Sequence, residues 1–306
     1  MSTNTEPALY LAAVQWQDEE PSLEFRIEGS ELPKFKRANE LDLRFRVIAD
    51  RPRRCIGTVE RSKDGTNSVP CDLPAVSLRQ CEKCQTKDNI AAANMHQAHR
   101  RGPEAISKPM AAYLTHPHRL YAAIFRDGST KVGTTRGSSG GNRLIEQGAW
   151  YAKYLAQVDD GFMVRELEDL VTEELGINQA VDTRKKFAGH LEPLSNQELI
   201  DRLEQLSNET EGLISKEIGT RGALLGERWS NPRTEDPMWS DLVAYPAAIS
   251  QGAHQFTIQS MVGRLAGCNR QGFEENFLLD LQPLLAHPIE TGDFEIDEFI
   301  MQDSLF

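Results

Sequence analysis

Between Leu120 and Val158 the chain reads LYAAIFRDGSTKVGTTRGSSGGNRLIEQGAWYAKYLAQV. An apolar run, an Asp-Gly turn and a second strand-like run, TKVGTT, are typical of a β-hairpin. A Gly/Ser loop follows, then a short helical segment, NRLIEQGA, and a further strand-like run, AKYLAQV. The pattern therefore predicts two paired strands, a helix and a third strand in this order.

Helices are predicted on the C-terminal side of this segment. Asp159 or Asp160 can cap a helix that runs to Gly176 and carries a one-sided apolar stripe. Ser195 and Glu198 form a capping box at the start of another helix. Alternation of apolar and polar residues predicts antiparallel strands within residues 8–54, and residues 255–292 again look β-rich.

Four of the five cysteines lie within thirty residues: Cys55, Cys71, Cys81 and Cys84. The last two form a CxxC turn, which directs two thiolates at one point, and two thiolates from a facing hairpin complete a tetrahedron around zinc. We therefore predict a closed, structural zinc site. The spacing is irregular, so His96 or His99 could replace one thiolate, and buried or redox-active thiols are the other interpretation.

Composition places the chain among ordinary globular proteins. Its 306 residues are 39% apolar and 26% charged, which excludes collagen-like, coiled-coil and wholly disordered chains. No run approaches the roughly 20 apolar residues of a membrane span. The first residues lack the basic start and apolar core of a secretory signal. We expect a soluble, cytoplasmic protein without a membrane partner.

The net charge of −12 is unevenly distributed. Residues 97–153 hold nine basic and three acidic residues, whereas residues 154–306 hold 11 basic and 28 acidic residues. The basic segment permits a local anion site, although such a run is often only a solvated face. The acidic C-terminal half fits an intramolecular cover or a surface for a protein partner.

These patterns predict an α+β chain with four regions. Residues 1–54 form a β-rich N-terminal region, and residues 55–117 form a zinc-ribbon-like cysteine module. Residues 118–190 form a domain of strands and helices, for which the family resemblance described next implies a small mixed sheet, and residues 191–306 form an acidic helical and β-rich region.

The domain over residues 118–190 resembles the GIY-YIG nuclease fold through YAAIFRDGSTKVGTT, NRLIEQGA and VRELEDLV. The chain is also similar to an uncharacterised prokaryotic family that couples a cysteine cluster to a GIY-YIG-like module. The shared motifs are CxxC, HPHRLYAA, KVGTTR, EQGA and RELE, and the resemblance covers roughly residues 50–190.

The resemblance implies a metal-dependent phosphodiester hydrolase that acts on DNA or RNA. Tyr121 would take the place of the family's first tyrosine and help to remove a proton from water, and Arg143 would hold the phosphate. Glu168 would bind catalytic Mg²⁺ or Mn²⁺. Arg136 and Gly133 would contribute to phosphate binding.

The sequence departs from the family at its second tyrosine segment, which reads Lys131-Val132-Gly133. Either Lys131 supplies the anion contact, or hydrolysis has been lost and phosphate binding kept. The alternatives are therefore a non-catalytic adaptor that binds nucleic acid or a phosphorylated ligand, or a biosynthetic enzyme that has recruited the fold. Tyr121 could instead pack on the sheet, and Glu168 could be a surface partner of Arg165.

Overall fold

The chain forms two compact units. The structure, a computed structural model, describes residues 7–30, 32–62, 65–137 and 141–296. The first unit combines residues 1–58, 70–85 and 237–306, and the second combines residues 59–69 and 86–236. The α+β class predicted from the sequence is confirmed, whereas the division into four regions stays a prediction.

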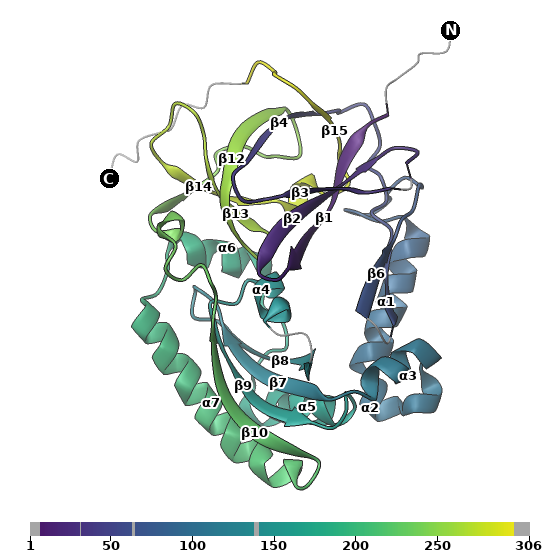
Figure 1. Cartoon of the computed structure of the whole chain (residues 1–306), viewed down its shortest axis with the longest axis vertical. Helices are drawn as coiled ribbons and strands as arrows, with labels where there is room; N and C mark the ends of the chain where they lie inside the picture. Colours follow the sequence, from purple (N-terminus) through teal and green to yellow (C-terminus); the bar gives the residue numbers. More distant parts are fainter. Residues whose placement is uncertain (1–6, 31, 63–64, 138–140, 297–306) are drawn as a thin grey trace. The chain divides into compact units, whose positions relative to one another are not determined.

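A large sheet forms the first unit, with strand order β11-β14-β13-β12-β4-β15-β1-β2-β3. Its strands are β1 (Leu9–Gln17), β2 (Glu20–Ile27), β3 (Lys34–Arg37), β4 (Leu41–Val47), β11 (Leu242–Ala244), β12 (Ala253–Val262), β13 (Leu265–Asn269), β14 (Asn276–Asp280) and β15 (Pro288–Thr291). Neighbouring strands are antiparallel except β11 and β14, which run parallel. The two ends of the chain therefore share one sheet, seen in purple and yellow-green in Figure 1.

Strand β4 shows why these residues form a half-buried sheet. Leu43, Phe45 and Val47 are buried, whereas the residues between them are exposed. This alternation has the period of two that a strand with one face on the core requires. The β-rich N-terminal and C-terminal segments predicted from the sequence are thus confirmed.

The second unit contains a four-stranded sheet with strand order β10-β9-β7-β8. Its strands are β7 (His118–Ile124), β8 (Thr130–Arg136), β9 (Tyr151–Val158) and β10 (Gly222–Ser230). All its pairings are antiparallel, so the prediction of a mixed sheet in this domain was wrong. The short connection through α4 (Asn142–Gln147) brings β9 back antiparallel to β7. The predicted hairpin, helix and third strand are confirmed.

The described residues also contain a two-stranded sheet, β5 (Thr58–Ser62) with β6 (Gly65–Val69), and seven α-helices. Besides α4, the helices are α1 (Glu82–His96), α2 (Ala98–Arg101), α3 (Lys108–Leu114), α5 (Met163–Leu175), α6 (Thr183–Leu191) and α7 (Asn196–Ile218). Both predicted starts are confirmed: Asp160 accepts from the first amides of α5, and Ser195 and Glu198 form the capping box of α7. Helix α7 packs along β9 (Figure 1). None of these helices is long and apolar enough to cross a membrane.

Candidate functional site

The four clustered cysteines lie together in the first unit. Cys55 lies in an extended segment that pairs with the segment after Cys71, through the bridge between Arg54 and Pro74. Cys81 directly precedes α1, and Cys84 lies in its first turn. The helix start therefore supplies the CxxC pair, and the extended segments supply the other two thiols.

The geometry of the cluster fits a tetrahedral metal site. All four sulfur atoms lie within 4.8 Å of one another, and the Sγ atoms of Cys71 and Cys81 are 3.9 Å apart. Sulfurs at about 2.3 Å from a tetrahedral zinc lie about 3.8 Å from one another. All four thiols are free rather than joined in disulfides. The cluster can thus hold one structural zinc ion. A cysteine would occupy each of the four coordination positions, so no position would stay open for catalysis.

Backbone donors and burial act differently on these thiols. A backbone hydrogen bond from Cys84 lowers the pKa of Cys81 to about 7, which favours the thiolate that a metal binds. Burial raises the pKa of Cys55 and that of Cys84. A cation at the centre of the cluster would offset that cost by stabilising all four thiolates.

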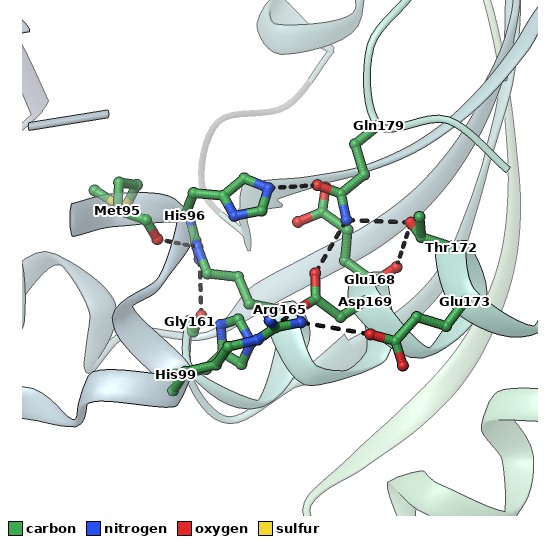
Figure 2. A network of polar contacts seen from close by, with 11 residues as sticks. Met95, His96, His99, Gly161, Arg165, Glu168, Asp169, Thr172, Glu173 and Gln179 are labelled. Atoms are coloured by element: carbon green, nitrogen blue, oxygen red, sulfur yellow. Dashed lines mark hydrogen bonds and ion pairs between the residues drawn. The ribbon is translucent and has the colours of Figure 1, made fainter. Parts of the chain in front are cut away.

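The two histidines considered as alternative zinc ligands have other partners. Nε2 of His96 lies 2.7 Å from Oε1 of Gln179, and Nε2 of His99 lies 3.0 Å from a carboxylate oxygen of Asp169 (Figure 2). The metal-ligand group found within the described residues consists of the four cysteines. The structure therefore supports the four-cysteine interpretation, and both imidazoles have partners within the second unit.

A second polar centre lies on the sheet of the second unit. Tyr121 on β7 is opposite Gly133 on β8, and Lys131 lies two residues before Gly133, so the side chains of Tyr121 and Lys131 share one face. Both donate to Oε1 of Gln147 at the end of α4, with Tyr121 Oη at 3.2 Å and Lys131 Nζ at 2.9 Å. Three successive elements therefore converge on one amide oxygen.

Burial shifts both donors toward their neutral forms. Tyr121 is 1% exposed, and burial raises the pKa of its phenol to about 12. Lys131 is 7% exposed, and burial, helped by the charge of Arg143, lowers the pKa of its ammonium to about 8. At neutral pH Tyr121 is a hydrogen-bond donor, whereas a fraction of Lys131 is a free amine.

Arg143 and Glu168 lie near enough for their charges to act on Tyr121 and Lys131. Arg143 is at the start of α4, is half exposed, and comes within 4.0 Å of the Glu146 carboxylate. Glu168 is on α5, and burial raises the pKa of its carboxyl against the opposing effect of Arg165, Lys131 and His96. A half-exposed guanidinium, a half-buried carboxylate and a buried lysine thus lie close enough in the second unit for their charges to interact.

The other two predicted phosphate contacts have different surroundings. Gly133 is buried, and the phenol of Tyr121 covers the side where its Cβ would be. Arg136 is at the far end of β8, with its guanidinium 5.6 Å from the centre of the Tyr113 ring. Their roles in phosphate binding stay predictions.

Acidic residues from later in the chain balance part of the positive charge of the basic segment, residues 97–153. Lys153 lies 3.1 Å from Glu211, and Arg119 lies 2.9 Å from Glu227. Arg100 binds Asp169 at 2.6 Å. The positive charge counted over residues 97–153 is therefore partly balanced within the second unit. Arg143 and Lys186 are the cations whose charges act on Lys131, and Lys186 also donates to the main-chain oxygen of Gln147 at 2.7 Å.

The segment from β4 to β11 also carries the relationship to other proteins. Residues 40–242 match a family described as "Protein of unknown function (DUF2797)". The chain belongs to the DUF2797 family. No curated protein and no solved structure matches the chain significantly. The DUF2797 segment contains all four clustered cysteines as well as the Tyr121 centre, Arg143 and Glu168.

Gln147 is a member of the Tyr121–Lys131 centre that the sequence did not predict. It follows Arg143 by four residues, which places the two side chains on one face of α4. This spacing was readable in the sequence. The amide gave no signal of its own because glutamine is common on solvated helix faces.

Proposed function

We propose that the module β7–β8–α4–β9–α5 is of the GIY-YIG type and cleaves phosphodiester bonds in nucleic acid. The observation that carries this proposal is the convergence of Tyr121 and Lys131 on Gln147, within reach of the charges of Arg143 and Glu168. The order of elements supports it, since a hairpin is followed by a helix, a strand beside the first hairpin strand and a second helix.

Each side chain has a distinct part in the proposed reaction. Arg143 binds the non-bridging phosphate oxygens with its planar guanidinium. Glu168 binds a divalent cation, which supplies Lewis-acid stabilisation of the phosphate when bound. Lys131 in its amine form takes the proton from the water that attacks phosphorus, and the bond to the leaving oxygen breaks.

This assignment differs from the expectation that Tyr121 takes the proton. A phenol with a pKa near 12 holds its proton at neutral pH, and its hydrogen bond to Gln147 orients it as a donor. Lys131, with a pKa near 8, is closer to the value that suits a general base. We assign to Tyr121 the role of fixing Gln147, and through it the amine of Lys131.

A second candidate function follows from the burial of Tyr121 and Lys131, which leaves little of either side chain in contact with solvent. In this alternative Arg143 binds a phosphate group of a nucleic acid or phosphorylated ligand and no hydrolysis follows. The cysteine cluster serves both candidates in the same way, as a zinc-stabilised structural element in the first unit.

The test is turnover of single- and double-stranded DNA and RNA in Mg²⁺ or Mn²⁺. We expect Arg143→Ala and Glu168→Ala to lose about 100-fold or more in rate, the order found when one charge-stabilising group is removed. Glu166→Ala is the matched control, because Glu166 is an exposed carboxylate on the same helix. A wild-type protein that binds one of these nucleic acids and cleaves none would favour the adaptor. Full activity in Glu168→Ala would contradict the assignment.

A further inference from the structure

Lys186 lies on α6, outside the five elements of the proposed module, yet its side chain reaches the candidate site. Its Nζ atom donates to the main-chain oxygen of Gln147 at 2.7 Å. Gln147 is the last residue of α4, and a carbonyl in the last turn of a helix has no intrahelical amide to bind. The same residue therefore accepts twice: its main-chain oxygen binds Lys186, and its side-chain oxygen binds Tyr121 and Lys131.

Helix α6 is tied to the hairpin formed by β7 and β8. A Cβ atom at Gly189 would overlap main-chain atoms of Asp127, in the turn between the two strands, so α6 lies directly against this turn. After α6, the amide of Leu194 donates to the carbonyl of Arg126 at 3.0 Å. Close main-chain contacts thus set the position of α6, and of Lys186 on it, relative to the hairpin.

The side chain of Lys186 is also held from below. Its Nζ atom lies 4.3 Å from the centre of the Phe125 ring, and a cation over an aromatic face is attracted by the negative face of the ring. Phe125 is 1% exposed and belongs to the same buried cluster as Tyr121. The core of the second unit therefore places the Lys186 cation at the end of α4.

The charge of Lys186 acts on the amine that serves as the base in the proposed reaction. Burial lowers the pKa of Lys131 most, Arg143 on α4 and Lys186 on α6 lower it further, and Glu168 on α5 raises it. The ring of Tyr121 also faces this amine, with its centre 5.7 Å from Nζ, and its phenol is neutral at neutral pH. Lys186 thus favours the free amine without belonging to the hairpin or to α4.

We propose that Lys186 is a positioning residue of the phosphodiester reaction, which holds Gln147 where its amide oxygen receives Tyr121 and Lys131 and which contributes a positive charge to the site. The inference rests on the proposed function, in which Lys131 is the base, and it adds α6 to the elements that the reaction needs. A lysine that only caps a helix would bind the last carbonyl and stabilise the fold, but it would leave the protonation of Lys131 unchanged.

The experiment follows the protonation of Lys131 in the full chain by nuclear magnetic resonance, through the chemical shift of its ¹³C-labelled Cε atom. The signal is assigned by its absence in Lys131→Arg. We expect Lys186→Met to move the midpoint of this titration to higher pH by about half a unit or more, because a nearby positive charge is lost. Lys186→Arg keeps the charge and a donor and should retain the wild-type midpoint. Lys185→Met alters the exposed neighbouring lysine and should also leave it unchanged.

Cleavage gives a second reading of the same variants. In Lys186→Met the kcat at pH 7 should fall about threefold or more, since a half-unit shift lowers the fraction of free amine by that factor. The KM should stay unchanged, because Lys186 positions protein groups rather than substrate. The rise of kcat with pH should move in step with the Lys131 midpoint.

An unchanged Lys131 midpoint in Lys186→Met would overturn the inference, and so would an equal shift in Lys185→Met. A shifted midpoint in a protein that cleaves no nucleic acid would leave the action of Lys186 on Lys131 standing and remove the proposed function. Cleavage that depends on Glu168, with an unchanged midpoint in Lys186→Met, would keep the proposed function and reduce Lys186 to a helix cap.

Discussion

The phenol of Tyr121 occupies the space in front of Gly133 on the neighbouring strand. A Cβ atom at position 133 would lie 2.5 Å from Tyr121 Oη and 2.6 Å from its Cζ, and the two residues are direct partners in the antiparallel register. Glycine at this position therefore makes room for the ring that binds Gln147. The candidate site depends on this absence of a side chain.

We predict that Gly133→Ala destabilises the protein by about 1–3 kcal/mol, the usual effect of inserting an atom into a packed site. The added methyl group must displace a buried ring and break its hydrogen bond to Gln147. Denaturant unfolding measures the change. Gly212→Ala on α7 is the control, because its Cβ meets nothing within 4 Å, and there we expect a gain of a few tenths of a kcal/mol to about 1 kcal/mol. Equal effects at the two positions would contradict the geometry.

The cysteine cluster predicts that the purified protein carries about one zinc ion per chain. Cys81→Ser and Cys84→Ser should each lose this metal and lower the free energy of unfolding, since metal binding is coupled to folding. Metal analysis by mass spectrometry measures the content. Cys268→Ala is the control, because Cys268 is buried in β13 with its thiol directed at the Phe277 carbonyl. Full zinc content in both serine variants would refute the site.

Local patterns predicted the local part of the fold. The strands β7, β8 and β9 and the caps of α5 and α7 follow from hydrophobic period, turn residues and capping residues that lie within a few positions of each other. Helix α1 was not predicted, because its sequence has no apolar stripe and most of its residues are exposed. The pairing of β4 with β12 and β15 was also not predictable, because a local pattern does not specify which distant strands pair or in what register.

The candidate site was predictable to a similar extent. The alternation of a strand places Tyr121 and Lys131 on one face, and the cysteine spacing identified all four thiols of the cluster. The partners of the basic segment were not predictable, because Lys153 meets Glu211 and Arg119 meets Glu227 only after the chain has folded. The contact between His96 and Gln179 likewise joins residues that are 83 positions apart in the chain.

The buried amine of Lys131 predicts a pH-dependent cost in stability. Its pKa in the folded protein, about 8, is below its ordinary value of 10.5, so the unfolded chain binds more protons between these two values. Stability should rise with pH across this window, and the cost of burying the charge is fully present below pH 8. Lys131→Met should therefore be more stable than the wild type at pH 7, with a difference that shrinks as the pH approaches 10.5.

Urea unfolding at pH 7, 8.5 and 10 tests this prediction. Lys153→Met is the control, because Lys153 is equally buried but is paired with Glu204 and Glu211, and we expect that variant to be less stable at all three values. A Lys131→Met variant that is destabilised at pH 7, by an amount independent of pH, would show that the ammonium is stabilised in the folded protein and would remove the argument for Lys131 as a base.

The exposed guanidinium of Arg143 predicts the salt dependence of nucleic-acid binding. A residue that neutralises one phosphate contributes about one unit to the slope of log affinity against log salt, because it releases one condensed counterion. Arg143→Gln should therefore weaken binding to DNA or RNA and lower the slope by about one.

Arg228→Gln is the matched control: Arg228 is the more exposed of the two, lies in the acidic half of the chain, and contacts Glu204 at 2.8 Å. Its loss should leave the slope unchanged, since its charge is already balanced. Fluorescence anisotropy titrations at salt concentrations between about 50 and 200 mM measure both slopes, because counterion release is readily resolved over this range. Equal slopes in the two variants would mean that binding follows overall charge rather than the site around Lys131.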